Sequence, residues 1–231
     1  MIKAIWIDID NTVLDFDAYV QDAMKVGFAR FGLGEYTEET YRIFKSVNSG
    51  FWHRLEAGEI TYAELLRDRW NAIFAALGIT YDGPTFEKYF KAYLFDSAIP
   101  VEGAMRLLEH LKGRYVLCVA SNGPVEQQRN RLRLAGMLPY FSHCFISEAV
   151  GAAKPSAEFF SYGMTEMNRG RACAIEAHEV LMLGDSLTSD MRGAMDCGMQ
   201  TCWLDRSGKG DAGDLAIGRI VHSLDELLEI L

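Results

Sequence analysis

The order of apolar and polar positions predicts a strand at the start of the chain, followed by a block of helices. Residues 2–9 are apolar and β-branched, interrupted by Lys3, which is typical of a central strand covered on both faces. Thr61 and Glu64 have the spacing of a capping box, which indicates a helix start. Helical periodicity of the apolar positions predicts helices at 19–31, 38–52, 62–77 and 86–95.

From Pro100 onward, helical and strand patterns alternate. Helices are expected at 104–111, 125–134, 157–168, 187–196 and from Asp225, and strands at 115–120, 144–147, 180–183 and 200–204. This alternation requires a mostly parallel sheet with right-handed crossovers. We therefore predict an α/β fold: a Rossmann-like core made of residues 1–16 and 97–231, with an all-helical domain inserted at 17–96. The glycine-rich stretch 207–218 is expected to be a surface loop.

Composition and charge limit the classes of partner. The chain has 231 residues, of which 49% are hydrophobic and 24% charged, as in ordinary globular proteins. It carries 23 basic and 32 acidic residues, a formal net charge of −9. A negative surface repels polymeric nucleic acid and anionic membranes. A small phosphorylated ligand stays compatible with this charge, because a bound cation can invert the local sign.

The cysteines and the N-terminal segment indicate a reducing compartment. The five cysteines have no CxxC spacing, so we expect reduced, buried thiols. The first ten residues hold a single Lys and two acidic residues, unlike a signal peptide. No apolar run reaches the roughly 18 residues that span a bilayer. These features favour a cytoplasmic protein, either a monomer or a homodimer.

Four predicted strands lead into polar segments that carry candidate chemistry. Each segment alone is a weak signal, because carboxylates near strand ends are commonly solvated turn formers. In an open parallel sheet, however, all strands present their carboxyl ends at one edge, where ligands bind. The segments are DIDNT at 8–12, SNG at 121–123, the dipeptide Lys154-Pro155, and GDSLTSD at 184–190.

These four segments, in this order, resemble motifs I to IV of the haloacid dehalogenase superfamily of aspartate-nucleophile hydrolases. The helical insert after the first segment resembles the C1 cap of that superfamily. Asn11 stands where glycine is commoner, and asparagine tolerates the backbone angles that such a loop uses.

The resemblance implies phosphoryl transfer. Asp8 would attack phosphorus and form an aspartyl-phosphate, and Asp10 would protonate the leaving group and then activate water. Dehalogenase members of the superfamily lack this second aspartate, whereas phosphatases and phosphomutases carry it. Ser121, Asn122 and Lys154 would bind the phosphoryl group, and Lys154 would also neutralise charge.

Several carboxylates facing a phosphate dianion require a cation. The resemblance implies Mg²⁺, a hard ion that prefers oxygen ligands, held by Asp8, the backbone carbonyl of Asp10 and Asp185. Asp190 would be a further ligand or would orient Lys154.

The insert offers candidate groups for substrate selection. Within residues 47–61, Asn48 and Trp52 could contact a nucleobase, although packing between helices is the simpler explanation of the aromatic side chains. This stretch and the segment ISEAVGAAKP resemble the pyrimidine 5′-nucleotidase branch, which implies a nucleoside monophosphate as substrate. A sugar-phosphate phosphatase, a phosphomutase of the β-phosphoglucomutase type and a non-catalytic binding protein remain alternatives.

Overall fold

The computed structural model describes residues 1–208 and 210–231. Lys209, within the predicted surface loop at 207–218, lies outside the described residues. The chain forms two compact units. One consists of Met1–Phe16 and Ala98–Leu231, and the other of Asp17–Ser97.

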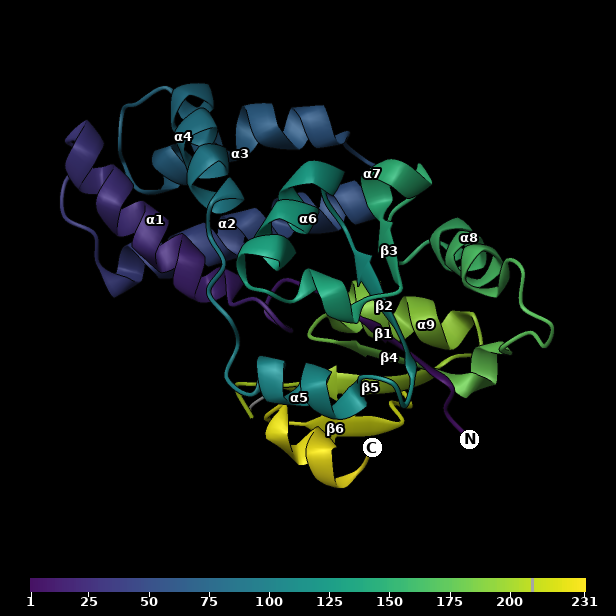
Figure 1. Cartoon of the computed structure of the whole chain (residues 1–231). Helices are drawn as coiled ribbons and strands as arrows, with labels where there is room; N and C mark the ends of the chain where they lie inside the picture. The colour runs from purple at the N-terminus through teal and green to yellow at the C-terminus, as the bar shows by residue number, and fades with distance from the viewer. Residues whose placement is uncertain (209) are drawn as a thin grey trace. The chain divides into compact units, whose positions relative to one another are not determined.

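The first unit is built on a parallel sheet with six strands among the described residues (Figure 1). Its strand order is β3-β2-β1-β4-β5-β6, and every neighbouring pair is parallel. The predicted Rossmann-like α/β architecture is thus confirmed. The strands are β1 (Ala4–Ile7), β2 (Val116–Ser121), β3 (His143–Ile146), β4 (Val180–Gly184), β5 (Gln200–Leu204) and β6 (Arg219–Val221).

Strand β6 was not predicted from the sequence. It is three residues long and lies at the edge of the sheet, where only Val221 is buried and Ile220 is 47% exposed. A strand of three residues is too short to show an apolar run or an alternation of apolar and polar positions.

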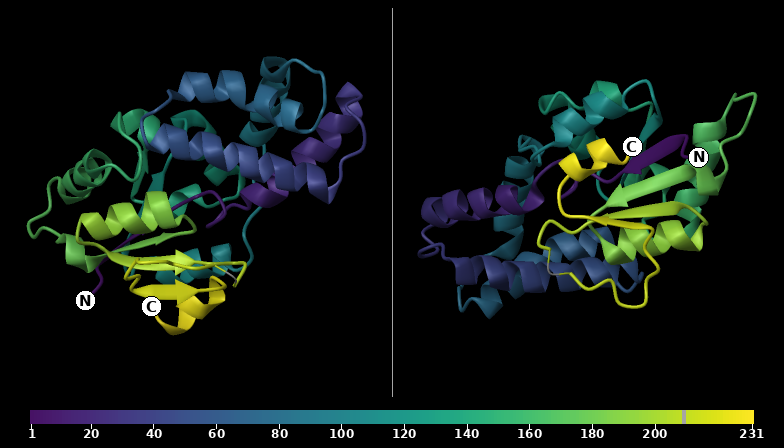
Figure 2. Two further views of the ribbon diagram at one scale, coloured as in Figure 1. Left: turned by 180° about the vertical axis from the view of Figure 1, so that it is seen from behind. Right: turned by 90° about the horizontal axis from the view of Figure 1, so that it is seen from below.

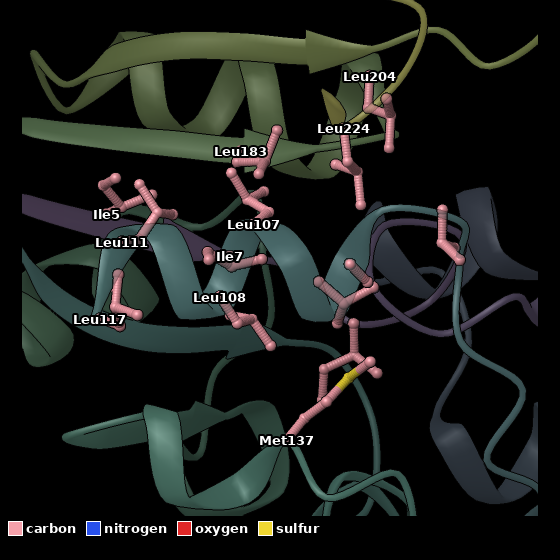
Figure 3. Packing of buried hydrophobic residues seen from close by; sticks show 14 of the residues in the cluster. Ile5, Ile7, Leu107, Leu108, Leu111, Leu117, Met137, Leu183, Leu204 and Leu224 are labelled. Atoms are coloured by element: carbon pink, nitrogen blue, oxygen red, sulfur yellow. The ribbon is translucent and has the colours of Figure 1, made fainter. Parts of the chain in front are cut away.

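One face of the sheet packs against helix α5 (Ala104–Leu111). Ile5 and Ile7 of β1 point to this face and belong to a buried cluster with Leu107 and Leu111 (Figure 3). A Leu side chain buried in this way contributes roughly 1.5–3 kcal/mol relative to exposure.

The opposite face packs against helix α8 (Ala157–Asn168) and helix α9 (Gly193–Asp196), which lie on the near side of the strands when the molecule is viewed from behind (Figure 2). Trp6 of β1 stacks on Phe160, with ring centroids 6.1 Å apart. Both faces of β1 are therefore covered, which explains why its sequence is continuously apolar.

Two predicted helices have a different form. The region predicted at 187–196 begins as a π-helical turn, η3 (Leu187–Arg192), before it continues into α9. The backbone amides of Asp190 and Met191 both donate to the Ser186 carbonyl, at 3.2 and 3.1 Å, and this widened turn accompanies an inward-facing Asp190.

The helix predicted from Asp225 is a 3₁₀ turn, η4 (Asp225–Glu229). Its backbone bonds span three residues, as from the Leu227 amide to the Leu224 carbonyl at 3.2 Å. Glu226 accepts from the backbone amide of Ser223 at 3.0 Å, so a side-chain cap forms at the start of this tighter turn.

The other helical elements of this unit are short connections at the sheet. They are α6 (Val125–Leu134), η1 (Leu138–Tyr140), α7 (Ser147–Val150) and η2 (Ala177–Glu179).

The second unit is helical, and residues 17–97, all of which the structure describes, contain no strand. The predicted capping box is present, since the Glu64 amide donates to Thr61 Oγ1 and the Thr61 amide donates to Glu64 Oε2. Its core includes the buried rings of Trp70 and Phe86, 4.3 Å apart. The helices are α1 (Phe16–Phe31), α2 (Glu38–Glu56), α3 (Tyr62–Ala76) and α4 (Gly83–Phe95).

All five cysteines are free. Cys118 and Cys202 are buried in strands as expected, but Cys173 is exposed, so the prediction of uniformly buried thiols is wrong at that position. Cys173 lies in the connection after α8, where no packed element covers it. Within the described part of the chain, no helix has the length and apolarity needed to cross a membrane.

Candidate active site

Asp8 directly follows β1, and its backbone extends the sheet because its amide donates to the Leu183 carbonyl at 2.9 Å. Its side chain is buried. Oδ1 accepts from Lys154 Nζ at 2.7 Å, and Oδ2 accepts from Thr12 Oγ1 at 3.3 Å. Asn11 in the following turn has φ +60°, the unusual backbone conformation that the sequence indicated. The first segment therefore folds back to hold its own leading carboxylate.

Lys154 is 2% exposed and uses its ammonium group in three short contacts. Nζ donates to Asp8 Oδ1 at 2.7 Å, to Asp190 Oδ1 at 2.6 Å and to the Ala120 carbonyl at 2.6 Å. An ammonium group has three donors, so these contacts account for all of them. The loop after α7 thus places one buried cation between carboxylates from the ends of β1 and β4.

Asp8, Asp185 and Asp190 form a group in which one carboxylate oxygen from each residue lies within 4.8 Å of the other two. Asp190 is fully buried, with Oδ1 on Lys154 and Oδ2 accepting from the Ser186 amide at 3.1 Å. A Cβ atom at Gly184 would lie 2.1 Å from Asp190 Oδ2, so the close approach of Asp190 requires glycine there. This all-oxygen donor set fits a hard divalent cation such as Mg²⁺.

The electrostatics of the cluster favour a bound cation. Burial raises the pKa of Asp8 to about 7, against the opposing effect of Lys154 and with a further contribution from Asp190. Burial, together with the charges of Asp8 and Asp190, also holds the pKa of Asp185 well above its ordinary value. Burial by itself would lower the pKa of Lys154, but the carboxylates of Asp190 and Asp8 raise it above its usual range. The single positive charge of Lys154 therefore does not neutralise the charge of the three carboxylates.

Asp10 has two partners that the sequence did not reveal. Arg131 Nη1 donates to Asp10 Oδ1 at 2.7 Å, and Gln128 Nε2 donates to Asp10 Oδ2 at 2.8 Å. Both partners come from α6, whose predicted range was correct. Their three-residue spacing puts them on one face of α6, together with the buried Leu132. In the sequence, the sign that this arginine is buried was its position on the same helical face as an apolar residue.

Ser121 is the last residue of β2 and is buried. Its Oγ accepts from Gln128 Nε2 at 2.9 Å, and its own hydrogen has a long contact of 3.4 Å with the Asn122 carbonyl. A hydroxyl whose oxygen already accepts a bond, and whose hydrogen is weakly engaged, can donate to an incoming acceptor.

Asn122 was expected to contact the substrate, but its side chain bonds to the backbone of Lys154. Lys154 N donates to Asn122 Oδ1 at 2.9 Å, and Asn122 Nδ2 donates to the Lys154 carbonyl at 3.0 Å. The amide therefore fixes the segment that carries the lysine.

Asn48 and Trp52 belong to α2 of the helical unit. Asn48 is buried, and its Oδ1 accepts from Arg69 Nη1 at 3.0 Å, while Arg69 also forms a buried ion pair with Glu87 at 2.7 Å. Trp52 is half-buried, with its ring centroid 6.3 Å from that of Tyr62. The oxygen of the Asn48 amide is thus used within the unit, and the Trp52 ring is partly accessible.

The four strand-end segments therefore meet at one edge of the sheet, as expected. Asp8, Asp185, Asp190 and Lys154 form one charged cluster. This cluster lies at the carboxyl ends of the parallel strands, the place where open α/β sheets bind their ligands.

Comparison with known families gives the same assignment. A family model described as haloacid dehalogenase-like hydrolase matches residues 2–198, and the chain belongs to this family.

Relatives and solved structures extend over nearly the whole chain. The pyrimidine 5′-nucleotidase PynA of Streptococcus pneumoniae is 32% identical over 231 residues, covering 99% of this chain and 94% of that protein. The pyrimidine 5′-nucleotidase YjjG of Escherichia coli is 29% identical over 227 residues, covering 98% and 96%. The crystal structure of the HAD-hydrolase YfnB from Bacillus subtilis, bound to magnesium, superposes with a TM-score of 0.90 at 29% identity, covering 100% and 98%. This protein is accordingly an enzyme of the phosphatase type.

Proposed function

We propose that this protein is a Mg²⁺-dependent phosphomonoester hydrolase that acts on nucleoside 5′-monophosphates, with a preference for pyrimidine bases. The observation that carries the proposal is the buried Asp8 carboxylate, 2.7 Å from Lys154 Nζ and beside two further carboxylates. An ionised carboxylate needs no base to act as a nucleophile, and the lysine supplies positive charge where the phosphoryl group arrives.

The first step transfers the phosphoryl group to the enzyme. A carboxylate oxygen of Asp8 attacks phosphorus as the bond from phosphorus to the ester oxygen breaks. Asp10 gives its proton to that ester oxygen, which leaves as an alcohol. Lys154 and the Ser121 hydroxyl bind the oxygens of the transferred group. The product is a phosphorylated Asp8 and an ionised Asp10.

The second step returns both residues to their starting states. Asp10 takes a proton from a water molecule as the water oxygen bonds to phosphorus. The bond between phosphorus and the Asp8 oxygen breaks, which releases inorganic phosphate and the free Asp8 carboxylate. Two displacements of moderate difficulty thereby replace one very slow hydrolysis.

Asp8, Asp185 and the backbone carbonyl of Asp10 would hold the Mg²⁺ ion, which supplies charge neutralisation when bound. Both oxygens of Asp190 are used on Lys154 and on the Ser186 amide. Because Asp190 is also fully buried, we assign it to holding Lys154 in place rather than to direct ligation. The magnesium bound in the YfnB structure supports the choice of ion.

We assign the helical residues 17–96 to a cap that covers the substrate, with residues 97–231 and 1–16 forming the catalytic core. Small phosphatases need such a cover to exclude water and to select the leaving group. The reported interdomain movement of YfnB supports a mobile cap. The names of PynA and YjjG support a pyrimidine nucleotide as substrate, and the Trp52 ring is the group we assign to stacking on the base.

Phosphate release from a panel of substrates tests the proposal. The panel contains UMP, dUMP, dTMP, AMP, glucose 6-phosphate and β-glucose 1-phosphate, each with Mg²⁺ and with EDTA. We expect Mg²⁺-dependent release that is fastest with the pyrimidine nucleotides. Equal rates on sugar phosphates would remove the nucleotide assignment, and rapid isomerisation of β-glucose 1-phosphate would show a phosphomutase. No release from any substrate would leave the binding-protein alternative.

A further inference from the structure

Both carboxylate oxygens of Asp10 are held by side chains from one helix. Arg131 Nη1 lies 2.7 Å from Oδ1, and Gln128 Nε2 lies 2.8 Å from Oδ2. The two donors are three residues apart on α6, so they project from the same face and reach the same carboxylate. Asp10 is on the loop after β1, more than a hundred positions earlier in the chain, and only the tertiary structure brings these groups together.

Burial of the Arg131 guanidinium group costs desolvation free energy. The Arg131 side chain is 1% exposed, whereas the Asp10 side chain is 31% exposed. A guanidinium group withdrawn from water needs a charged partner, and a buried ion pair of this kind is seldom a net gain in stability over apolar packing. The buried guanidinium group therefore pairs with a carboxylate that is still partly exposed to solvent.

Gln128 further fixes the position of Asp10, because both polar atoms of its side-chain amide have hydrogen-bond partners. Its Oε1 accepts from Arg131 Nη1 at 2.9 Å, and its Nε2 donates both to Asp10 Oδ2 and to Ser121 Oγ. The amide orientation is therefore determined by its neighbours, since the flipped form would face donor with donor and acceptor with acceptor. One side chain thus connects Asp10, Ser121 and Arg131.

We propose that Arg131 and Gln128 are positioning residues that hold Asp10 in place for proton transfer. This inference rests on the proposed function, in which Asp10 protonates the leaving oxygen. Neither residue touches the reacting atoms. Arg131 fixes one oxygen of the carboxyl group, and Gln128 fixes the other and sets its distance from Ser121.

The arrangement leaves Asp10 able to carry a proton. Each carboxylate oxygen has two lone pairs, and each uses one on the α6 side chains. The second lone pair stays available for the proton that passes to the ester oxygen and is later recovered from water. A carboxyl group fixed at both oxygens loses little freedom when the reaction begins, which lowers the barrier to transfer.

The consequence for activity depends on the leaving group. An alkoxide such as the 5′-oxygen of a nucleoside needs a proton to depart, whereas p-nitrophenolate is stable without one. Asp10→Asn should therefore lower kcat/KM, which reports the first step, by about 10²- to 10⁴-fold for UMP and far less for p-nitrophenyl phosphate. Arg131→Met should reproduce this selectivity, with kcat/KM for UMP lowered by about 10²-fold. The second step is common to both substrates, so its slowing does not change the ratio of their kcat/KM values.

The test compares, in matched variants, the ratio of kcat/KM for UMP to kcat/KM for p-nitrophenyl phosphate. Arg133→Lys is the control, because Arg133 is an exposed arginine on the same helix and bonds to Asn130. Arg131→Lys keeps a positive charge without the planar fork and should recover part of the ratio. Gln128→Met should lower the ratio and also slow both substrates, since it removes a contact with Ser121. Thermal unfolding with Mg²⁺ confirms that each variant is folded.

A double-mutant cycle separates positioning from general loss of structure. If Arg131 acts through Asp10, then Arg131→Met adds little to the UMP defect of Asp10→Asn. An equal loss of kcat/KM for both substrates in Arg131→Met, or an additive defect in the double variant, would overturn the inference. If the unmodified enzyme hydrolyses neither substrate, the proposed function itself fails, and this result is distinct from failure of the positioning role.

Discussion

The side chain of Asn122 and the backbone of Lys154 are joined by two reciprocal hydrogen bonds, of 2.9 and 3.0 Å. The bonds tie the end of β2 to the loop that delivers the lysine. Asn122→Ala removes both and leaves a backbone donor and acceptor without their partner. We expect a loss of about 1–3 kcal/mol in the free energy of unfolding, measured with urea. Catalytic turnover should fall because the Lys154 loop is released.

The matched control for that substitution is Asn122→Asp, which keeps an acceptor for the Lys154 amide but loses the donor to its carbonyl. It should lie between the native protein and Asn122→Ala in both measurements. An Asn122→Ala protein with native stability and turnover would show that the pair does not position the lysine.

Replacing the nucleophile should abolish turnover without unfolding the protein. Asp8→Asn keeps the size of the side chain but puts a neutral amide where a carboxylate oxygen must attack phosphorus. We expect phosphate release to fall by at least about 10³-fold, with an unchanged circular dichroism spectrum. Substantial turnover by this variant would assign the nucleophile to another residue.

Removing the buried cation should affect stability as well as activity. Lys154→Met leaves Asp8 and Asp190 buried without the ammonium group that bridges them at 2.7 and 2.6 Å. We expect a loss of about 3–5 kcal/mol in the absence of Mg²⁺. Lys25→Met, at an exposed lysine of α1, is the control and should change stability by less than about 0.5 kcal/mol. A native-like Lys154→Met protein would contradict the assigned charge balance.

Stabilisation by Mg²⁺ should increase with pH. The pKa of Asp8 is about 7 in the folded protein and 3.8 as the ordinary value, so the metal-free native state binds an extra proton between these values and loses stability as pH rises through them. Cation binding to the ionised carboxylates offsets that loss. Thermal unfolding with Mg²⁺ and with EDTA should therefore show a larger difference at pH 8 than at pH 6. An equal difference at both pH values would exclude linked proton release.

The half-buried ring of Trp52 should influence substrate selectivity if it stacks on the base of the substrate. Trp52→Ala should raise the KM for UMP by about 5- to 150-fold, since stacking on a base contributes about 1–3 kcal/mol, and leave the KM for glucose 6-phosphate nearly unchanged. Phe51→Ala is the control, because neighbouring positions on a helix face different directions. Equal effects of the two substitutions would indicate that Trp52 only packs within the helical unit.

The sequence was sufficient to predict the parallel sheet and the edge at which chemistry gathers. β1 is continuously apolar because both of its faces are covered, and such a run is readable without coordinates. Parallel strands present their carboxyl ends together, so Asp8, Ser121 and Asp185 could be placed at one edge from their order alone. Lys154 followed from the same reasoning, through the segment after β3.

The partners of individual side chains depended on the packing of helices against that edge. Arg131 and Gln128 reach Asp10 because α6 packs next to the loop after β1. No local sequence pattern encodes the distance between these two segments. Asn122 bonds to the backbone of Lys154 because the fold brings the end of β2 next to the loop after α7. Sequence determined which groups stand at the strand ends, because each strand is a local apolar pattern and the alternation with helices makes the strands parallel. Tertiary structure alone decided which of them touch, because contact depends on the relative placement of elements that are remote along the chain.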